Sequence, residues 1–242
     1  MKQKNISSIK FILGISCFLF LFTACTVSTT TNTTVSEGRV VMTVTDALVK
    51  MGTITSVKMT VDSVEFHSDA KGWIEVATPH RTYDLVALNV NGYNALLADL
   101  SLSPQRFDQI RLKVSDVRVT DENGTHDAKM PSGTLRLNGE IVVLSGKTAT
   151  ASFDFITDES LHRAGNGKYV FAPVIQLESR TDANADTTIS DNVRITGGQV
   201  QTSSRVGMDT LGNLVVGGTL PPFLNIDSNG KISGTEDKLK IN

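Results

Sequence analysis

Short runs of alternating apolar and polar residues recur along the chain from Gly38 onward, and they constrain its fold more than any other feature. A period of two places apolar side chains on one face of a β-strand, whereas a helix needs a period near 3.6. Asp121-Glu122-Asn123-Gly124 predicts a hairpin turn, because Asn-Gly readily takes positive φ. A change of phase between Val114 and Val117 predicts a β-bulge. The runs predict strands at residues 40–44, 57–66, 73–76, 83–88, 110–119, 135–137, 141–144, 148–155 and 169–177.

One segment has helical rather than alternating spacing. Asn91 can act as an N-cap, and apolar residues recur at helical intervals from there to Leu100. The sequence therefore predicts one short helix over residues 91–100. Many short strands, turns between them and almost no helix indicate an all-β fold. We predict a β-sandwich of the immunoglobulin or transthyretin-like kind rather than a barrel.

The chain changes character after residue 180. Residues 181–191 are polar and weakly patterned, which predicts a linker. Short strands are expected after it, but this tail is too small to build a second core with confidence. We expect a sandwich domain over residues 38–180 and a linker with a small β-rich extension over 181–242. The extension either packs on the main domain or is a fragment of an appended β-module. Its predicted strands are residues 193–195, 198–201 and 214–216.

The N-terminus has the layout of a secretory signal. Three lysines within the first ten residues are followed by the uncharged apolar run from Phe11 to Phe22 and then by Thr23-Ala24-Cys25. The apolar run is shorter than the ~20 residues that a membrane-spanning helix needs. Residues 1–24 are therefore predicted to be a signal peptide.

The end of this signal, Leu21-Phe22-Thr23-Ala24-Cys25, resembles a bacterial lipobox. The resemblance implies cleavage between Ala24 and Cys25 and lipid attached to Cys25. Stable anchoring takes two or more acyl chains, and a mature lipoprotein usually carries three. Thr26 stands where an Asp tends to retain lipoproteins in the inner membrane, so the outer membrane is expected. Residues 25–37, rich in Thr and Ser, cannot bury a core and are predicted to be a flexible tether.

Charge and cysteine usage exclude several classes. Removal of the three leader lysines leaves 20 basic and 25 acidic residues, a net charge of about −5. This balance disfavours nucleic acid and polybasic membrane docking. Of the two cysteines, Cys17 lies in the leader and Cys25 would carry lipid, so no disulfide is expected within the mature chain.

Short motifs follow one another in a distinctive order along the main body. They are Gly38-Arg39-Val40, Thr45-Asp46-Ala47, Val64-Glu65-Phe66-His67 before Trp73, Tyr83-Asp84-Leu85, Leu96-Leu97-Ala98, Phe107-Asp108-Gln109-Ile110-Arg111-Leu112, Met130-Pro131-Ser132-Gly133, Phe153-Asp154-Phe155, Ser160-Leu161 and Ala172-Pro173-Val174-Ile175. In that order, over residues 38–178, the chain resembles the bacterial family known as domain of unknown function 4382. The resemblance implies an envelope lipoprotein with a β-sandwich domain and brings no established activity. Leu48, where the family often has Pro, and Arg106-Phe107-Asp108, where it often has Gly-Xaa-Tyr, are departures at turn or core positions.

The tail offers two further comparisons. Residues 218–224 and 227–235 resemble a hairpin of immunoglobulin-like repeats on bacterial surface proteins, with Phe223 in place of the usual Gly. Residues 225–236 place Asn, Asp, Asn, Gly, Ser and Glu at the spacing of an EF-hand calcium loop. However, Pro221-Pro222 would break the helix that should enter such a loop. A β-hairpin with Asn229-Gly230 at its turn is the expected structure.

Candidate catalytic and metal-binding residues are few. Asp46 closes the first predicted strand, and we expect its carboxylate to accept backbone N–H bonds. Asp154 is expected on a solvated face, although the two carboxylates could form one site if the fold brought them together. The histidines show no His-Xaa-His or His-Glu-Xaa-Xaa-His spacing, so no metal is predicted. Ser132 is expected in a turn, and Trp73 is either a core anchor, a half-buried strand residue or a sugar-stacking residue.

These observations favour a non-enzymatic envelope module that binds a protein or a glycan, with no catalytic residues and no cofactor. The membrane partner would be reached through lipid on Cys25. A periplasm-facing accessory subunit of an envelope complex is the second hypothesis. A calcium-assisted hydrolase using Asp46 or Asp154 is the third.

Overall fold

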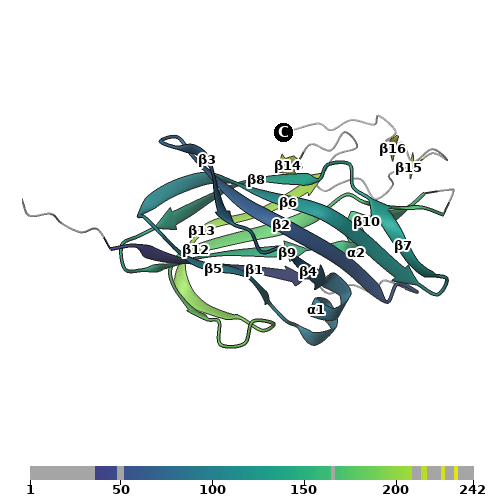
Figure 1. Ribbon diagram of the computed structural model, residues 1–242, viewed down its shortest axis with the longest axis horizontal. Coiled ribbons are helices and arrows are strands. Elements are labelled where there is room, and N and C mark those ends of the chain that lie inside the picture. Colours follow the sequence, from purple (N-terminus) through teal and green to yellow (C-terminus); the bar gives the residue numbers. More distant parts are fainter. Residues whose placement is uncertain are drawn as a thin grey trace, which may run out of the picture. The chain divides into compact units, whose positions relative to one another are not determined.

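The computed structural model describes residues 36–47, 52–164, 167–208, 214–216, 225–226 and 232–233, all within one compact unit of residues 35–242. These residues form two main β-sheets and two short helices, so the predicted all-β sandwich is confirmed (Figure 1). No helix among them is long and apolar enough to cross a membrane. Cys25, Ala24 and the rest of the predicted leader lie outside the described residues.

The first sheet has the strand order β14-β13-β12-β9-β1-β5. Neighbouring strands are antiparallel except β1 and β9, which run parallel. Its strands are β1 (Gly38–Asp46), β5 (Ala95–Leu102), β9 (Thr148–Phe155), β12 (Val174–Asp186), β13 (Arg194–Met208) and β14 (Leu214–Val216).

The second sheet has the order β10-β11-β7-β6-β2-β3, with β4 also paired to β2 and β8 also paired to β6. The long strands β2 and β6 each pair with two strands on the same side. One stretch of β2 pairs with β3 and another with β4, and one stretch of β6 pairs with β7 and another with β8. Its strands are β2 (Ser56–Ser68), β3 (Gly72–Ala77), β4 (Arg81–Asp84), β6 (Gln105–Asp121), β7 (Gly124–Lys129), β8 (Thr134–Val143), β10 (Leu161–Arg163) and β11 (Tyr169–Phe171).

The core lies between the two sheets and is built from alternate residues of their strands. Phe66 and Phe107 of the second sheet are fully buried, with ring centroids 5.0 Å apart. Phe153 and Phe155 of β9 are equally buried from the opposite sheet. An aromatic side chain buries about 150–250 Å², so these residues contribute strongly to the core.

The predicted bulge in β6 is confirmed. Asp116 pairs with Thr60, but the next pair joins Val114 to Val61, so Ser115 has no partner across the strand. Its hydroxyl instead donates a 3.1 Å hydrogen bond to Asp62, the unpaired residue of β2. The hairpin turn at residues 121–124 is confirmed as well, since β6 ends and β7 begins there.

The predicted helix over residues 91–100 is wrong, because residues 95–102 form β5. The helix α1 (Leu85–Asn91) lies earlier, where a strand over 83–88 was expected. The Asp84 carboxylate accepts a hydrogen bond from the backbone N–H of Ala87 and caps α1, while Gly92, with φ of 63°, ends it. The second helix, α2 (Thr157–Ser160), is a single turn.

The linker expected at residues 181–191 is also wrong, since β12 continues through its first half to Asp186. The hairpin between β12 and β13, light green in Figure 1, curls across β5. Backbone hydrogen bonds fix it there, from Leu96 to Ser190 and from Val193 to Asn94. The helix-like spacing within β5 comes from its pairing with β1. Ala98 pairs with Met42 and Leu96 with Thr43, so Leu97 is unpaired at a shift of register. Leu97 is buried in the core and Leu100 packs against it, although the two are three residues apart.

Two other expectations meet the structure only in part. The strand expected over 169–177 is two strands, β11 and β12, which belong to different sheets and flank Ala172-Pro173. In the tail, β15 (Asn225–Ile226) pairs antiparallel with β16 (Ile232–Ser233), as a hairpin requires. The residues of the expected turn and most of the calcium-loop positions lie outside the described part of the chain.

Candidate binding face

The outer side of β3, β2, β6 and β8 carries polar and aromatic side chains in register. Successive strand pairings bring these residues into rows across four strands, since side chains of paired residues project from the same face. One row is Trp73, His67, Gln109 and Asn138, and the next is Glu75, Glu65, Arg111 and Arg136.

Trp73 lies at the centre of a cluster of cationic and aromatic groups. Its ring centroid lies 3.7 Å from the guanidinium carbon of Arg111 and 5.5 Å from that of Arg136. The His67 ring is 5.1 Å away. Trp73 is partly exposed, so it is a half-buried strand residue rather than a core anchor, and its ring is open to a ligand. Cation–π contacts of this kind contribute about 0.5–1 kcal/mol at exposed sites and hold the ring in place.

An ion-pair network lies beside the ring. Glu65, whose side chain is 12% exposed, pairs with Arg111 at 2.8 Å and with Lys113 at 2.7 Å. The hydrogen bond from Lys113 is the largest cause that lowers the pKa of Glu65, and Arg111 acts in the same direction against the effect of burial. Arg136 is exposed, and its guanidinium forms no ion pair within the described residues. The face therefore offers a cation beside a fixed aromatic ring.

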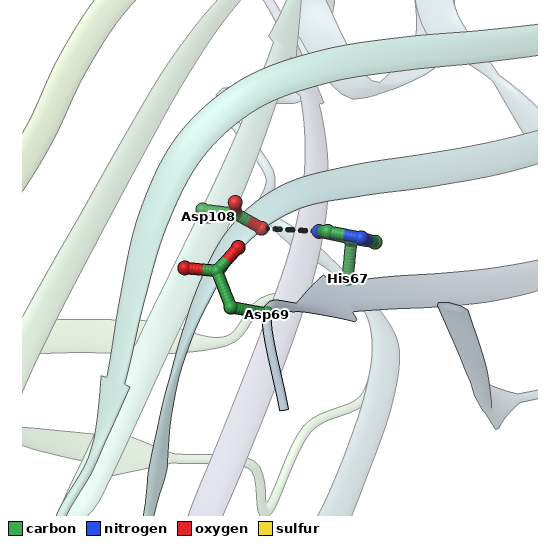
Figure 2. Close-up of side chains that lie close together, drawn as sticks. All are labelled: His67, Asp69 and Asp108. Atoms are coloured by element: carbon green, nitrogen blue, oxygen red, sulfur yellow. Dashed lines mark hydrogen bonds and ion pairs between the residues drawn. The ribbon is translucent and has the colours of Figure 1, made fainter. Parts of the chain in front are cut away.

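His67, Asp69 and Asp108 gather at one end of this face, where β2 turns into β3 (Figure 2). The Nδ1 atom of His67 lies 2.7 Å from Oδ1 of Asp108. Each residue offers one ligand atom, and these atoms all lie within 4.8 Å of one another. Sequence reasoning missed this group because it searched for paired histidines, whereas here one histidine of β2 lies beside one carboxylate from the following turn and one from β6.

A second irregularity in β6 brings Asp108 to this face. Phe107 pairs with Ile141 and Gln109 with Asn138, so Asp108 is the unpaired residue of β6 at a shift of register against β8. Phe107 and Ile110 are buried while Asp108 is exposed and Gln109 partly so, which places two consecutive side chains on the outer face. Bulges commonly re-aim a side chain in this way. The spacing Phe107-Asp108-Gln109-Ile110 is the signal in the sequence that could have revealed it.

Asp46 has the structural role that the sequence predicted. Its carboxylate accepts hydrogen bonds from the backbone N–H of Thr157 at 3.0 Å and from the Thr157 hydroxyl at 2.7 Å. Burial raises the pKa of Asp46 to about 7, and the charges of Asp154 and Asp158 act in the same direction. The hydrogen bonds from Thr157 oppose this shift without cancelling it.

The structure does not bring Asp46 and Asp154 into one site. The parallel pairing of β1 and β9 sets Thr45 beside Asp154 and Asp46 beside Phe155, a residue of the core. Since consecutive residues of a strand project to opposite faces, the two carboxylates leave the sheet on opposite sides. Asp154 is half-buried rather than fully solvated as expected, and burial raises its pKa to about 6.

A third polar group joins β6, β7 and β11. The Asp121 carboxylate, 2% exposed, accepts a 2.8 Å hydrogen bond from the Tyr169 hydroxyl and lies 3.0 Å from Nε2 of His126. The hydrogen bond from Tyr169 is the largest cause that lowers the pKa of Asp121 to about 2. An open cavity of about 650 Å³ lies beside His126 and is also lined by Asp127, Ala128, Lys129, Gly167 and Lys168. The Asp121 carboxylate therefore links the β6–β7 hairpin to β11 by hydrogen bonds, which is a structural role.

Ser132 lies in a turn, as predicted. Its hydroxyl donates to the carbonyl of Thr134 and accepts from the Thr134 backbone N–H. The remaining histidines are dispersed: His80 lies 3.5 Å from Asp62, and His162 is partly buried, which lowers its pKa.

Comparisons with known proteins agree with the order of motifs along the chain. No curated protein and no solved structure matches the chain. A family model described as "Domain of unknown function (DUF4382)" matches residues 37–173. The match confirms the family resemblance over the main body and stops just before β12, the strand that joins β9 to the last part of the first sheet. Because it covers more than half of the 242 residues, the chain belongs to the DUF4382 family.

Proposed function

We propose that this protein is a lipid-anchored module of the bacterial cell envelope, and that its sandwich binds an acidic glycan on the outer face around Trp73. The observation that carries the binding proposal is a partly exposed tryptophan held 3.7 Å from Arg111, with the unpaired guanidinium of Arg136 beside it. A sugar ring can stack on the indole while Arg136 pairs with a carboxylate of the same glycan. Neighbouring polar side chains in the same rows, such as Gln109 and Asn138, can hydrogen-bond to hydroxyl groups.

The geometry does not favour a hydrolase that uses both Asp46 and Asp154. Asp46 and Asp154 leave their sheet on opposite sides, so they cannot converge on one substrate atom. The accessory-subunit alternative uses the same anchor and differs in the side of the envelope on which the domain lies.

The anchor proposal predicts a specific N-terminus. The mature protein should begin at Cys25 and carry lipid there, as the sequence Thr23-Ala24-Cys25 indicates. Mass spectrometry of the N-terminal peptide from cell membranes measures this directly. A Cys25→Ala variant should lose the lipid and leave the detergent phase. An unmodified terminus at Cys25 or Thr26 in the wild type would overturn the anchor.

The binding proposal predicts how variants of the face respond to glycans. Trp73 is the only tryptophan of the chain, so intrinsic fluorescence reports on this face alone. Titration with uronic-acid or sialic-acid oligosaccharides should change the emission saturably. Arg136→Gln should weaken binding of acidic oligosaccharides about tenfold, a loss of ~1.4 kcal/mol, and leave neutral ones nearly unaffected.

Arg118→Gln is the charge control, because Arg118 is 57% exposed and lies on β6, the strand next to β8, which carries Arg136. It removes an equal charge at a distance from Trp73 and should leave affinity unchanged. Calorimetry extends the test to Trp73→Ala, which lacks the fluorophore and should bind at least tenfold more weakly. Equal affinities of the wild type and both face variants would overturn the glycan proposal, as would a lack of binding by either class of oligosaccharide.

A further inference from the structure

We propose that His67, Asp69 and Asp108 form a binding site for one divalent transition-metal ion, with Zn²⁺ as its best chemical fit. The site goes beyond the proposed glycan binding, since its ligands are His67, Asp69 and Asp108, whereas the glycan would contact Trp73 and Arg136. An ion bound there would lie at the end of the proposed binding face, where it could either contact a ligand or stabilise the fold.

The donor set favours a transition metal. One imidazole nitrogen and two carboxylate oxygens suit Zn²⁺ and its first-row neighbours, whereas Ca²⁺ and Mg²⁺ take oxygen ligands. Zinc bonds to His and Asp are about 2.0–2.2 Å long, which sets donor atoms in a tetrahedral site about 3.4 Å apart. The donor atoms of this group already lie within 4.8 Å of one another. Rotation of the exposed Asp69 and Asp108 side chains would bring the donor atoms closer to that spacing.

The charge of the group is not balanced by cationic side chains. Asp108 pairs with His67, and among the described residues neither Asp69 nor Asp108 forms an ion pair with a lysine or arginine. On the same face, Glu65 is paired with both Arg111 and Lys113. Two carboxylates with neighbouring oxygen atoms repel each other unless a cation lies between them. A divalent ion would supply that charge.

Two features of the fold bring the ligands together without distortion. His67 is the last outward-facing residue of β2, and Asp69 follows in the turn that begins directly after Ser68, so the turn brings its carboxylate beside His67. The irregularity in β6 turns Asp108 toward them, as Figure 2 shows. His67 and Asp108 are 23% and 48% exposed, so an ion can enter from solvent. With three protein donors, a coordination position remains for water or for an oxygen of a ligand.

The position of the site next to the single tryptophan makes a direct test possible. The His67 ring lies 5.1 Å from that of Trp73, so a paramagnetic ion bound to His67 should quench the fluorescence strongly. The experiment titrates Co²⁺ into the purified full chain in detergent micelles and then adds Zn²⁺. We expect saturable quenching by Co²⁺ and recovery on addition of Zn²⁺, which binds such sites more tightly.

Asp69→Asn and Asp108→Asn keep Trp73 and the shape of the side chains, and each should weaken Co²⁺ binding at least tenfold. His126→Gln is the matched control: His126 also lies beside a carboxylate, 3.0 Å from Asp121, but on another part of the sheet. It should leave the midpoint unchanged. A second readout is the thermal midpoint of unfolding, which Zn²⁺ should raise in the wild type and in His126→Gln but not in the two Asn variants.

The proposal fails if Co²⁺ up to about 1 mM gives no saturable quenching and Zn²⁺ no thermal shift, since that limit corresponds to only ~4 kcal/mol of binding. It also fails if the Asn variants respond like the wild type. Neither outcome bears on glycan binding, because no glycan is present in the titration.

Discussion

A chain that spans residues 36–173, essentially the region matched by the family model, should fail to fold. The cut removes β12 and β13, and with them the neighbour of β9 in the first sheet. Val174, Ile175, Leu177 and Val206 are fully buried in the intact protein. Each such side chain contributes about 1.5–3 kcal/mol by burial, or together on the order of 6–12 kcal/mol. That loss is comparable with the whole stability of a typical domain, about 5–15 kcal/mol.

Contacts between the sheets would be lost as well. The Leu177 side chain packs at Gly139 of β8 so closely that a methyl group there would collide with it. Thr202 of β13 accepts a 2.7 Å hydrogen bond from the backbone N–H of Glu140. Removal of these groups would leave β9 as an open edge, which favours aggregation.

The comparison needs a longer chain as its control. Residues 36–216 keep every strand of the two main sheets and should unfold cooperatively in a thermal melt followed by far-ultraviolet circular dichroism. The single change Leu177→Ala in the full chain should be milder, with a cost of about 2–5 kcal/mol in the free energy of unfolding. A cooperative transition of the 36–173 chain near that of 36–216 would show that the matched region is self-sufficient.

Elements with clean alternation could be predicted from the sequence, and those shaped by distant contacts could not. β9 was predicted over the residues it occupies, because its inner side faces the core and its pattern is simple. β5 was mistaken for a helix, since its pairing with the distant strand β1 shifts register at Leu97 and brings both Leu97 and Leu100 to the core. A single sequence does not show that shift of register.

The candidate site shows the same division. The sequence singled out Trp73, but its partners depend on the register of four strands. A register shift of one residue would turn Arg111 to the other face. The role of Asp108 depends on an irregularity that interrupts the alternation of β6. By contrast, Asp46 was predicted correctly as a hydrogen-bond acceptor, although its partner Thr157 lies beyond the reach of local patterns.

Asp46→Asn should stabilise the protein more at pH 8 than at pH 5. Burial raises the pKa of Asp46 to about 7, whereas an aspartate in an unfolded chain titrates near 3.9. Between these values the folded state holds a proton that the unfolded state has released. Stability therefore falls as pH rises through this window, and the full cost is present above pH 7. From pH 5 to pH 8 we expect a loss of about 1–3 kcal/mol from this group.

Asparagine keeps an oxygen that can accept the hydrogen bonds of Thr157 and carries no charge to desolvate. The variant should thus lack this part of the pH dependence. Asp154→Asn should also flatten the profile, since burial raises the pKa of Asp154 to about 6. It should in addition lower the pKa of Asp46, because the Asp154 charge helps to raise it.

Urea denaturation at pH 5, 6, 7 and 8 measures the free energy of unfolding of each variant. This pH range of 5 to 8 is above the pH at which Asp99 and Asp121 become protonated, because their pKa values are lowered. Loss of their stabilising charge therefore does not affect the comparison. Partly buried His162 acts with the opposite sign, since its lowered pKa makes stability rise with pH, but its contribution cancels when variant and wild type are compared at each pH. Asp127→Asn is the control, because that side chain is 88% exposed and its removal should leave the profile unchanged. Parallel profiles of Asp46→Asn and the wild type would mean that Asp46 is charged in the folded protein at no cost, so the hydrogen bonds from Thr157 would outweigh its burial.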